Sequence, residues 1–449
     1  MFKIDLTKTV GKIKPLHGIN NGPISYGNLT DLRTQYKNAG IPIVRLHDTD
    51  WPGPYQVDIP KIFPNFDADA NDPASYRFAQ TDEIISAIFE VGAEPIYRLG
   101  VSIEHIKERI YARKPSDFQK WADICVHVIR HYNEGWANGG HYGIRFWEIW
   151  NEPDGGANMW TDGTAEDYYE MYCVASKAIR AACPDVFVGG YAATSVYKEE
   201  FVEGFFEKIR AEGAPLDFFS YHKYSQGSNC REYVDDAAKA REYVVNYGYP
   251  NALIICDEWN YVVDQTAWDS LSPLRQETPM MERRRCYQAM KDMPGASFCA
   301  ATMTCMQNSE VDIAAYYDGQ PHMLWCGLFD GFGVEQKTFY AFQAFDKLYR
   351  LGEQLKVTGN VENCYALAAK KEDRAFVLLT NHNGADCDLE VSFAGESAQK
   401  VTVYLLDDSH DLEKDRVEHI AAKDFEMHVC LAHNSIVLLE LEAEKENKE

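Results

Sequence analysis

The sequence lacks the short motifs that bind nucleotides and metals. Neither G-x-x-x-x-G-K-[ST] nor G-x-G-x-x-G occurs, which removes the usual phosphate-binding loops. The 12 cysteines form no C-x-x-C pair and the histidines are scattered, so a zinc site is not expected. Cysteines that lie inside apolar segments are expected to be reduced and buried, as at Cys125, Cys256, Cys299 and Cys305. We therefore expect no cofactor and no bound metal.

Basic residues and long apolar runs are also scarce. There are 44 Lys and Arg against 69 Asp and Glu, and the net charge of −25 disfavours nucleic acid or an anionic membrane as a partner. No stretch approaches about 18 uninterrupted apolar residues, so no membrane span is expected. The first residues contain no apolar core of the kind found in signal peptides. We therefore expect a cytoplasmic protein with a small neutral substrate, and the sequence leaves a homo-oligomer open.

Strand-like and helix-like segments alternate along most of the chain. Eight such units predict an α/β fold in which parallel strands close into a (β/α)8 TIM barrel. The alternative is an open doubly wound sheet, which usually carries a phosphate loop after its first strand. The expected strands are Leu16–Pro23, Ile41–Asp48, Ala93–Gly100, 144–152, Val186–Ala192, Asp217–Tyr224, Leu253–Asn260 and Ala300–Met306.

The pattern changes from Lys356 onward. Short alternating runs are separated by Asn, Asp, Gly and charged turns, which predicts a small antiparallel β-sandwich completed by the N-terminal strand Phe2–Val10. The expected domains are a catalytic barrel over 15–350 and an accessory β-sandwich formed by 1–14 and 356–445. We expect the accessory domain to pack on the barrel, and the sequence does not decide whether it contributes to the active site.

The stretch 146–154, FWEIWNEPD, runs apolar and aromatic and then stops at Asn-Glu-Pro. It suits a strand that is buried on both faces and ends at the proline. Alternation places Glu148, Trp150 and Glu152 on the inward face, with Asn151 on the other. Burial beside tryptophans would disfavour the charged form of Glu152 and make it a proton donor. The alternative is a glutamate that only caps the strand.

A second stretch, 253–260, repeats this arrangement. LIICDEWN is again an apolar run, and alternation gives Cys256, Glu258 and Asn260 a common inward face. Glu258 follows Glu152 by 106 residues, which leaves room for three βα units. Two carboxylates that flank one bond are the standard apparatus of glycoside hydrolysis. The two motifs therefore predict a glycosidase.

With W-N-E-P in the fourth expected strand and D-E-W-N in the seventh, the sequence resembles the clan A glycoside hydrolases, which are retaining (β/α)8 enzymes. More narrowly, it resembles glycoside hydrolase family 39, whose known members include β-xylosidases. This resemblance covers nearly the whole chain and implies a retaining glycosidase. Our first hypothesis is an exo-acting β-glycosidase that trims short oligosaccharides or glycosides, since the lack of a secretion signal favours small, imported substrates over polymers. The stretches that carry it are HGINNGP (17–23), VRLHD (44–48), FWEIWNEPD (146–154), SYHKY (220–224) and ICDEWN (255–260).

The resemblance also implies roles for individual residues. It makes Glu152 the general acid/base and Glu258 the nucleophile, an assignment that the residue patterns alone leave open. It places Asn151 at the 2-hydroxyl of the substrate, where hydrogen bonds strengthen in the transition state. It further implies that His222 and Tyr224 contact the nucleophile and the sugar.

Other candidates follow from their positions at strand ends. Arg45 is a cation on a buried strand and needs a carboxylate partner, either Glu258 or, in a purely structural pair, Glu148. His47 and Asp48 lie at the end of the same strand and are expected to reach sugar hydroxyls.

Asn21, after the first strand, is a further binding candidate, and Trp325 could either stack on the sugar or belong to the core. The long loop 49–76 leaves the second strand at its carboxyl end and is expected to form a wall of the active site. Two other functions stay open: a related enzyme for arabinose, galactose or glucose, and a catalytically silent carbohydrate-binding protein.

Overall fold

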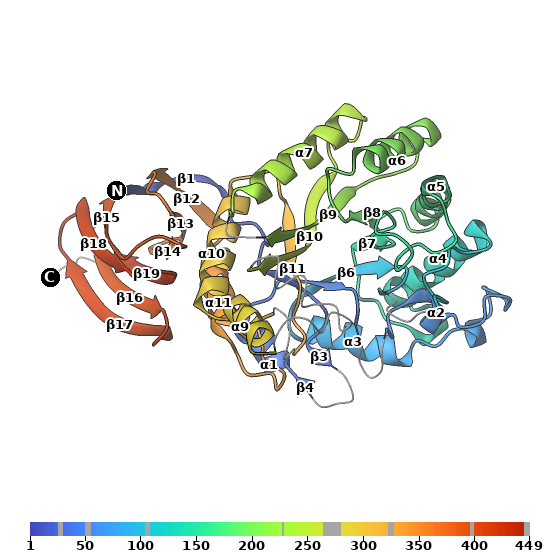
Figure 1. Ribbon diagram of the computed structural model, residues 1–449, viewed down its shortest axis with the longest axis horizontal. Coiled ribbons are helices and arrows are strands. Elements are labelled where there is room, and N and C mark those ends of the chain that lie inside the picture. Colours follow the sequence, from blue (N-terminus) through green and yellow to red (C-terminus); the bar gives the residue numbers. More distant parts are fainter. Residues whose placement is uncertain are drawn as a thin grey trace.

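The larger part of the protein is a closed barrel of parallel strands (Figure 1). The structure is a computed structural model that describes residues 1–25, 30–49, 55–103, 108–226, 229–263, 280–321, 327–395 and 399–443. The barrel strands are β2 (Gly18–Asn20), β5 (Ile43–Leu46), β6 (Glu94–Leu99), β7 (Phe146–Ile149), β8 (Phe187–Ala193), β9 (Phe218–Gln226), β10 (Leu253–Val262) and β11 (Ile313–Tyr316). Each pairs in parallel with the next, and β11 returns to β2, so the predicted TIM barrel is confirmed.

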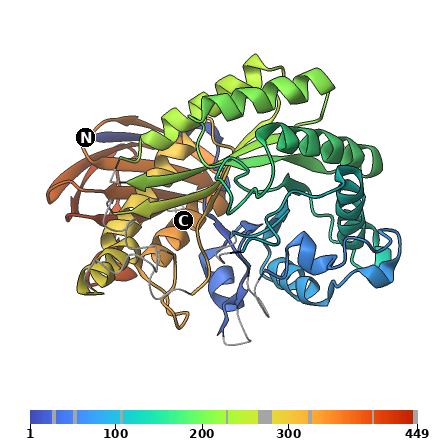
Figure 2. The ribbon, with the colours of Figure 1, turned by 45° about the vertical axis from the view of Figure 1, so that its right-hand side comes forward.

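Helices cover the outside of this barrel (Figure 2). Local signals set several of their ends. For example, Thr164 and Asp167 form a reciprocal capping box at the start of the fifth helix. The helices are α1 (Arg33–Ala39), α2 (Ile59–Ile62), α3 (Ala79–Glu90), α4 (Phe118–Glu134), α5 (Ala165–Ala182), α6 (Glu199–Glu212), α7 (Glu232–Asn246), α9 (Met280–Lys291), α10 (Met293–Gln307) and α11 (Lys337–Leu351), with the 3-10 turns η2 (Pro73–Ser75) and η3 (Trp136–Asn138) and the hairpin β3 (Ile24–Ser25) and β4 (Thr30–Asp31).

One predicted strand is wrong. Residues 300–306 lie within α10, and the eighth barrel strand is β11. A short apolar run fits a buried helix as well as a buried strand, so periodicity could not separate the two. Helix α10 is buried on nearly every side because it lies between the barrel and the C-terminal sheet.

The interior of the barrel is built in layers. An apolar floor is made of one side chain from each of six strands: Ile43, Ile96, Phe146, Phe218, Ile255 and Ile313. Because side chains alternate along a strand, the residue two positions later points inward again, one layer closer to the carboxyl end. On five of these strands that residue is polar, and the set consists of Arg45, Arg98, Glu148, Ser220 and Asp257. The barrel is therefore apolar below and densely polar near its carboxyl end.

The C-terminal part is a single nine-stranded sheet that is antiparallel except where β1 pairs with β15. Its strands are β1 (Phe2–Lys12), β12 (Glu353–Gly359), β13 (Cys364–Lys371), β14 (Arg374–Asn381), β15 (Cys387–Ala394), β16 (Gln399–Leu406), β17 (Asp411–Ile420), β18 (Phe425–Leu431) and β19 (Ser435–Ala443). Strands from both ends of the sheet contribute to one apolar core, so the sheet curls over itself as a sandwich does.

This sheet domain packs against α10 and α11 of the barrel (Figure 1). At the contact, Ser297 and His382 are both buried and lie 2.8 Å apart from Oγ to Nδ1. In the described part of the chain, no helix combines the length and the apolar character that crossing a membrane would require.

Candidate active site

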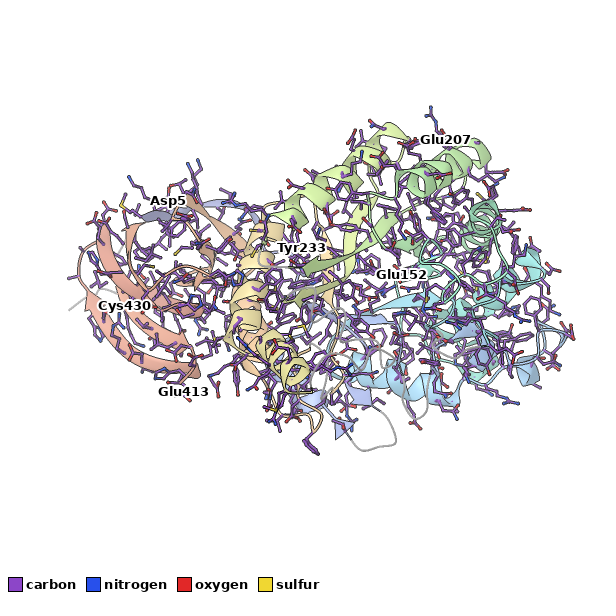
Figure 3. All side chains as sticks on the ribbon, viewed as in Figure 1. Asp5, Glu152, Glu207, Tyr233, Glu413 and Cys430 are labelled. Atoms are coloured by element: carbon purple, nitrogen blue, oxygen red, sulfur yellow. The ribbon has the colours of Figure 1, made fainter. Side chains whose placement is uncertain are left out.

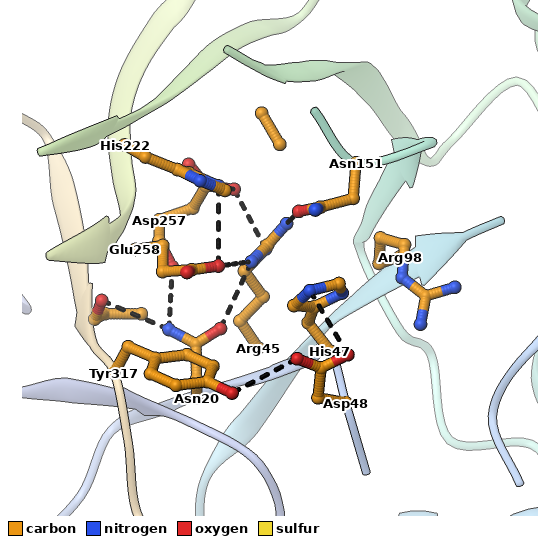
Figure 4. A network of polar contacts seen from close by, with 12 residues as sticks. Asn20, Arg45, His47, Asp48, Arg98, Asn151, His222, Asp257, Glu258 and Tyr317 are labelled. Atoms are coloured by element: carbon orange, nitrogen blue, oxygen red, sulfur yellow. Dashed lines mark hydrogen bonds and ion pairs between the residues drawn. The ribbon is translucent and has the colours of Figure 1, made fainter. Parts of the chain in front are cut away.

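Arg45 is the centre of the polar layer (Figure 4). Strand β5 directs its side chain into the barrel, where it is completely buried. Its guanidinium lies 2.8 Å from Glu148, 2.8 Å from Asp257 and 3.0 Å from Glu258. Burial alone would lower the pKa of Arg45, but these three carboxylates raise it, so the side chain stays charged. Of the two partners expected from the sequence, Arg45 thus contacts both.

After strand β7, the side chains that point into the site are not those expected from the alternation of side chains along a strand. The backbone leaves the strand after Ile149, and Trp150 and Glu152 adopt positive φ values of 72° and 45°. As a result Asn151 turns inward, and its Oδ1 accepts a hydrogen bond of 2.6 Å from Arg45. Trp150 instead packs edge-on against Trp160. The prediction that Trp150 shares the inward face with Glu152 is therefore wrong.

Glu152 lies at the carboxyl end of the barrel, far along the molecule from the sheet residues Glu413 and Cys430 (Figure 3). Its backbone N–H donates to the carbonyl oxygen of Ala192 at the end of β8, which fixes the turn. Its side chain is 21% exposed, and its Oε1 lies 2.6 Å from Nδ1 of His222. A histidine, and not the expected tryptophans, is thus the direct neighbour of this carboxylate.

Strand β10 contains a bulge at the second motif. Cys256 pairs with Tyr221 and Glu258 with His222, so Asp257 is an extra residue with no counterpart on β9. Both Asp257 and Glu258 consequently face Arg45, although they are adjacent in sequence. The prediction that Cys256 shares the inward face is wrong, since Cys256 belongs to the large apolar core of the protein and not to the polar layer inside the barrel. A charged residue inside an otherwise apolar run was the signal that could have identified Asp257.

Glu258 is held from three sides and is 6% exposed. Tyr224 donates a hydrogen bond to its Oε1, Arg45 to its Oε2, and Nε2 of His222 lies 3.6 Å from the same Oε2. Burial raises the pKa of Glu258, while His222 and Arg45 act in the opposite direction. Because Glu152 contacts the other nitrogen of the same imidazole, the structure brings the two predicted acids together.

His47 and Asp48 follow β5 at its carboxyl end. Nε2 of His47 lies 3.4 Å from Asp48, which also accepts hydrogen bonds from the backbone N–H of Ile103 at 2.9 Å and from the hydroxyl of Tyr317 at 3.1 Å. Burial raises the pKa of Asp48 to about 7, and burial together with Arg45 lowers that of His47. His47 is therefore a neutral imidazole near neutral pH.

The remaining candidates have different outcomes. Asn21 is buried beside the site, but its amide bonds protein groups on both sides, the carboxylate of Asp318 and the hydroxyl of Thr49, each at 3.1 Å. Trp325 lies outside the described residues, so its contact with sugar stays a prediction. The described part of loop 49–76 is tied to β6, because Asp58 accepts a 2.6 Å hydrogen bond from Arg98.

Two supporting residues besides Asp257 were not predicted from the sequence. The amide of Asn20 donates to the carbonyl oxygen of Asp257 at 2.8 Å, and Ser220 donates to Glu148 at 2.6 Å. Both are small polar residues on buried strands, and this is the signal by which they could have been identified. Within the described ranges, no three His, Cys, Asp or Glu side chains are grouped as metal ligands.

Comparison with known proteins matches residues 3–289 to the family model for glycosyl hydrolases family 39. The chain belongs to this family. The resemblance inferred from the two glutamate motifs is therefore confirmed, and both motifs lie inside the matched range. Family 39 membership also agrees with the closed barrel that carries the site.

The chain is also similar to three individual proteins. A β-xylosidase from Caldicellulosiruptor saccharolyticus is 24% identical over 344 residues, which cover 69% of this chain and 64% of the relative. A β-xylosidase from Geobacillus stearothermophilus is 27% identical over 177 residues, 36% of this chain and 34% of the relative. The crystal structure of a glucosidase from Croceicoccus marinus superposes with a TM-score of 0.81 at 22% identity and covers 99% of both chains. The matches thus span less than two thirds of either curated relative.

Proposed function

We propose that this protein is a retaining, exo-acting β-glycosidase that removes terminal glycosyl residues from short oligosaccharides or glycosides. The observation that carries the proposal is the pairing of Glu152 and Glu258 on opposite nitrogens of His222. The two carboxyl groups thus converge on one imidazole, and in retaining enzymes the second carboxyl group attacks the sugar directly. Family 39 membership supports the same chemistry.

In the first half of the reaction, Glu258 attacks the anomeric carbon and the bond to the leaving oxygen breaks. Glu152 gives its proton to that oxygen, and a covalent glycosyl-enzyme intermediate forms. The nucleophile must be ionised for this step. Arg45 and Tyr224, which both donate hydrogen bonds to Glu258, stabilise its anionic form.

In the second half, Glu152 acts as a base. It takes a proton from a water molecule, whose oxygen attacks the anomeric carbon and releases Glu258. Two displacements at one carbon restore the original anomeric configuration. The side chain of Glu152 is the more exposed of the two acids, which suits the residue that must meet both leaving group and water.

In this scheme Asn151 is the residue proposed to bind the 2-hydroxyl of the sugar. Arg45 fixes its Oδ1, and no described residue accepts a hydrogen bond from its Nδ2. The amide N–H groups are therefore the part of Asn151 that a substrate can use. His47 and Asp48 are the further candidates for sugar hydroxyls, because they lie at the carboxyl end of β5.

The substrate proposed first is a β-xyloside, as for the curated relatives, and arabinose, galactose and glucose are the alternatives. The test is a panel of nitrophenyl glycosides of xylose, arabinose, glucose, galactose and fucose in both anomers. NMR of the first-formed sugar then reports the stereochemistry. Hydrolysis of a β-glycoside with retention is expected. An inverted product would overturn the retaining mechanism, and sugar binding without turnover on any substrate would favour a carbohydrate-binding protein.

A further inference from the structure

Two buried carboxyl groups have no part in the mechanism described above. Glu148 and Asp257 are both completely buried, and each has an oxygen 2.8 Å from Arg45. Both groups therefore lie against the same buried cation. Since two carboxylates this confined repel each other when both are ionised, we take the pair to hold one proton and one negative charge.

The surroundings decide which of the two carries the charge. Burial raises the pKa of Glu148 to about 8, so Glu148 is the protonated partner near neutral pH. Burial acts in the same direction on Asp257, but Arg45 and His222 outweigh it and lower the pKa of Asp257. Asp257 is therefore an anion that faces the interior of the site.

His222 lies between this anion and the two acids of the proposed mechanism. Its Nδ1 is 2.6 Å from Glu152, and its Nε2 is 3.7 Å from Asp257 and 3.6 Å from Glu258. A neutral imidazole carries a hydrogen on one nitrogen and a lone pair on the other. Because Nε2 faces two carboxylates, a lone pair on that nitrogen would be repelled by both.

We propose that Asp257 is a positioning residue that keeps a hydrogen on Nε2 of His222. Nδ1 then shares a second proton with Glu152, and this proton is the one that passes to the leaving oxygen. The inference rests on the proposed function only in naming Glu152 as the acid. Because the carboxyl group of Glu148 is neutral, the positive charge of Arg45 pairs with the anions of Asp257 and Glu258.

Several charged groups act on the imidazole of His222. They are the carboxylates of Glu152, Asp257 and Glu258 and the guanidinium of Arg45, and His47 is a further titratable neighbour. Burial, Arg45 and Arg98 keep His47 neutral. Although burial of His222 would lower its pKa, the carboxylates of Glu258, Asp257 and Glu152 raise it well above the usual range. The electrostatic balance thus agrees with the geometric argument.

The first test uses the wild-type protein. Histidine side chains labelled with 15N are titrated by NMR, and the signal of His222 is assigned by its loss in His222→Gln. We expect Nε2 to stay protonated across the neutral range and up to pH 8, where an ordinary histidine with a pKa of about 6.5 is neutral and exchanges between tautomers. A His222 that carries its lone pair on Nε2 at pH 7 would overturn the proposal.

The second test compares two changes with nearly the same chemistry, Asp257→Asn and Glu148→Gln. Removal of the Asp257 charge should shift the titration of His222 to lower pH by about one unit or more. Glu148→Gln replaces a neutral carboxyl with a neutral amide, so the titration of His222 should stay where it is in the wild type. A shift in Glu148→Gln equal to that in Asp257→Asn would place the charge on Glu148 and refute the assignment.

These measurements are independent of turnover. They report the proton on His222 even if the protein hydrolyses none of the glycosides in the panel, so failure of the proposed function and failure of this inference are distinguishable. If Asp257→Asn does not fold, the wild-type titration still decides the proposal. In folded Asp257→Asn, the pH profile of kcat/KM should change shape and the profile of Glu148→Gln should keep its shape.

Discussion

The guanidinium of Arg45 lies 3.0 Å from the carboxylate of Glu258, although 213 residues separate them along the chain. Both side chains are buried or nearly so, and the same guanidinium fixes the amide of Asn151. Arg45 therefore contacts both glutamate motifs, through Asn151 in the first and Glu258 in the second. A rigid planar donor with five N–H groups can serve several acceptors at once, which a lysine cannot.

Arg45→Lys should impair both stability and activity. Lysine cannot reach all the acceptors, and a buried carboxylate that loses its partner destabilises a protein by about 3 kcal/mol or more. We expect a lower melting temperature by calorimetry and a fall in kcat/KM of about 100-fold or more, since the geometry of the nucleophile depends on this contact. Lys12→Met is the control, because Lys12 pairs with Glu353 on the surface and is 76% exposed. Equal effects of the two changes would contradict the role given to Arg45.

Glu258→Gly should abolish hydrolysis and leave a space where the nucleophile stood. Azide can enter this space and attack the anomeric carbon from the same side, with Glu152 still present to assist departure of the leaving group. The expected product from a β-glycoside is an α-glycosyl azide, identified by NMR. An azide product with the β configuration would mean that the roles of Glu152 and Glu258 are exchanged.

Glu152→Ala should discriminate between substrates by their leaving groups. A dinitrophenolate departs without a proton, whereas an alkoxide needs one, and general acid catalysis contributes about 10²- to 10⁴-fold. We expect the rate of glycosyl-enzyme formation to fall by that amount for alkyl glycosides and far less for dinitrophenyl glycosides. Pre-steady-state kinetics measures this step directly. A uniform loss across leaving groups would exclude Glu152 as the acid.

Asp48→Asn should change how stability depends on pH. Burial raises the pKa of Asp48 from 3.8 to about 7, so between these values the folded protein binds a proton that the unfolded chain releases. The contribution of Asp48 to the free energy of unfolding therefore falls as pH rises through this window. Relative to the wild type, Asp48→Asn should gain stability from pH 4 to pH 7, by about 3 kcal/mol, measured by urea unfolding.

The backbone at Asp48 favours this experiment. Its φ of 57° lies in the left-handed region, which asparagine tolerates well. The amide oxygen of asparagine can still accept the hydrogen bond from Ile103. Asp185→Asn, at an exposed position, is the matched control and should follow the wild-type pH dependence. If both variants behave alike, the charge of Asp48 is not disfavoured in the folded protein.

The sequence alone predicted the barrel and the positions of both glutamates. Each glutamate follows an apolar run that ends abruptly, and such runs occur at the carboxyl ends of buried parallel strands. Regular alternation of strands and helices then implied closure, since connections of this kind return each strand to the same sheet. These features depend on local patterns, which do not require knowledge of distant contacts.

Predictions from local sequence patterns were wrong where two different conformations fit the same residues. The apolar run at 300–306 suits a helix or a strand, and only its position between the barrel and the sheet domain made it helical. The backbone leaves the strand at Trp150, so the alternation of side chains along a strand no longer applies there. In both cases packing against segments far along the chain overrode the local preference.

The two glutamate motifs and the strands that carry them were thus determined by the sequence itself, because hydrophobic periodicity is a property of neighbouring residues. The tertiary structure decided what surrounds those glutamates. The bulge that turns Asp257 toward Arg45 arises from the pairing of β10 with β9, and Arg45 on β5 meets Glu258 on β10 only because the barrel closes. Contacts between strands that are remote in sequence fix the charges and protons of the site, and no single segment contains that information.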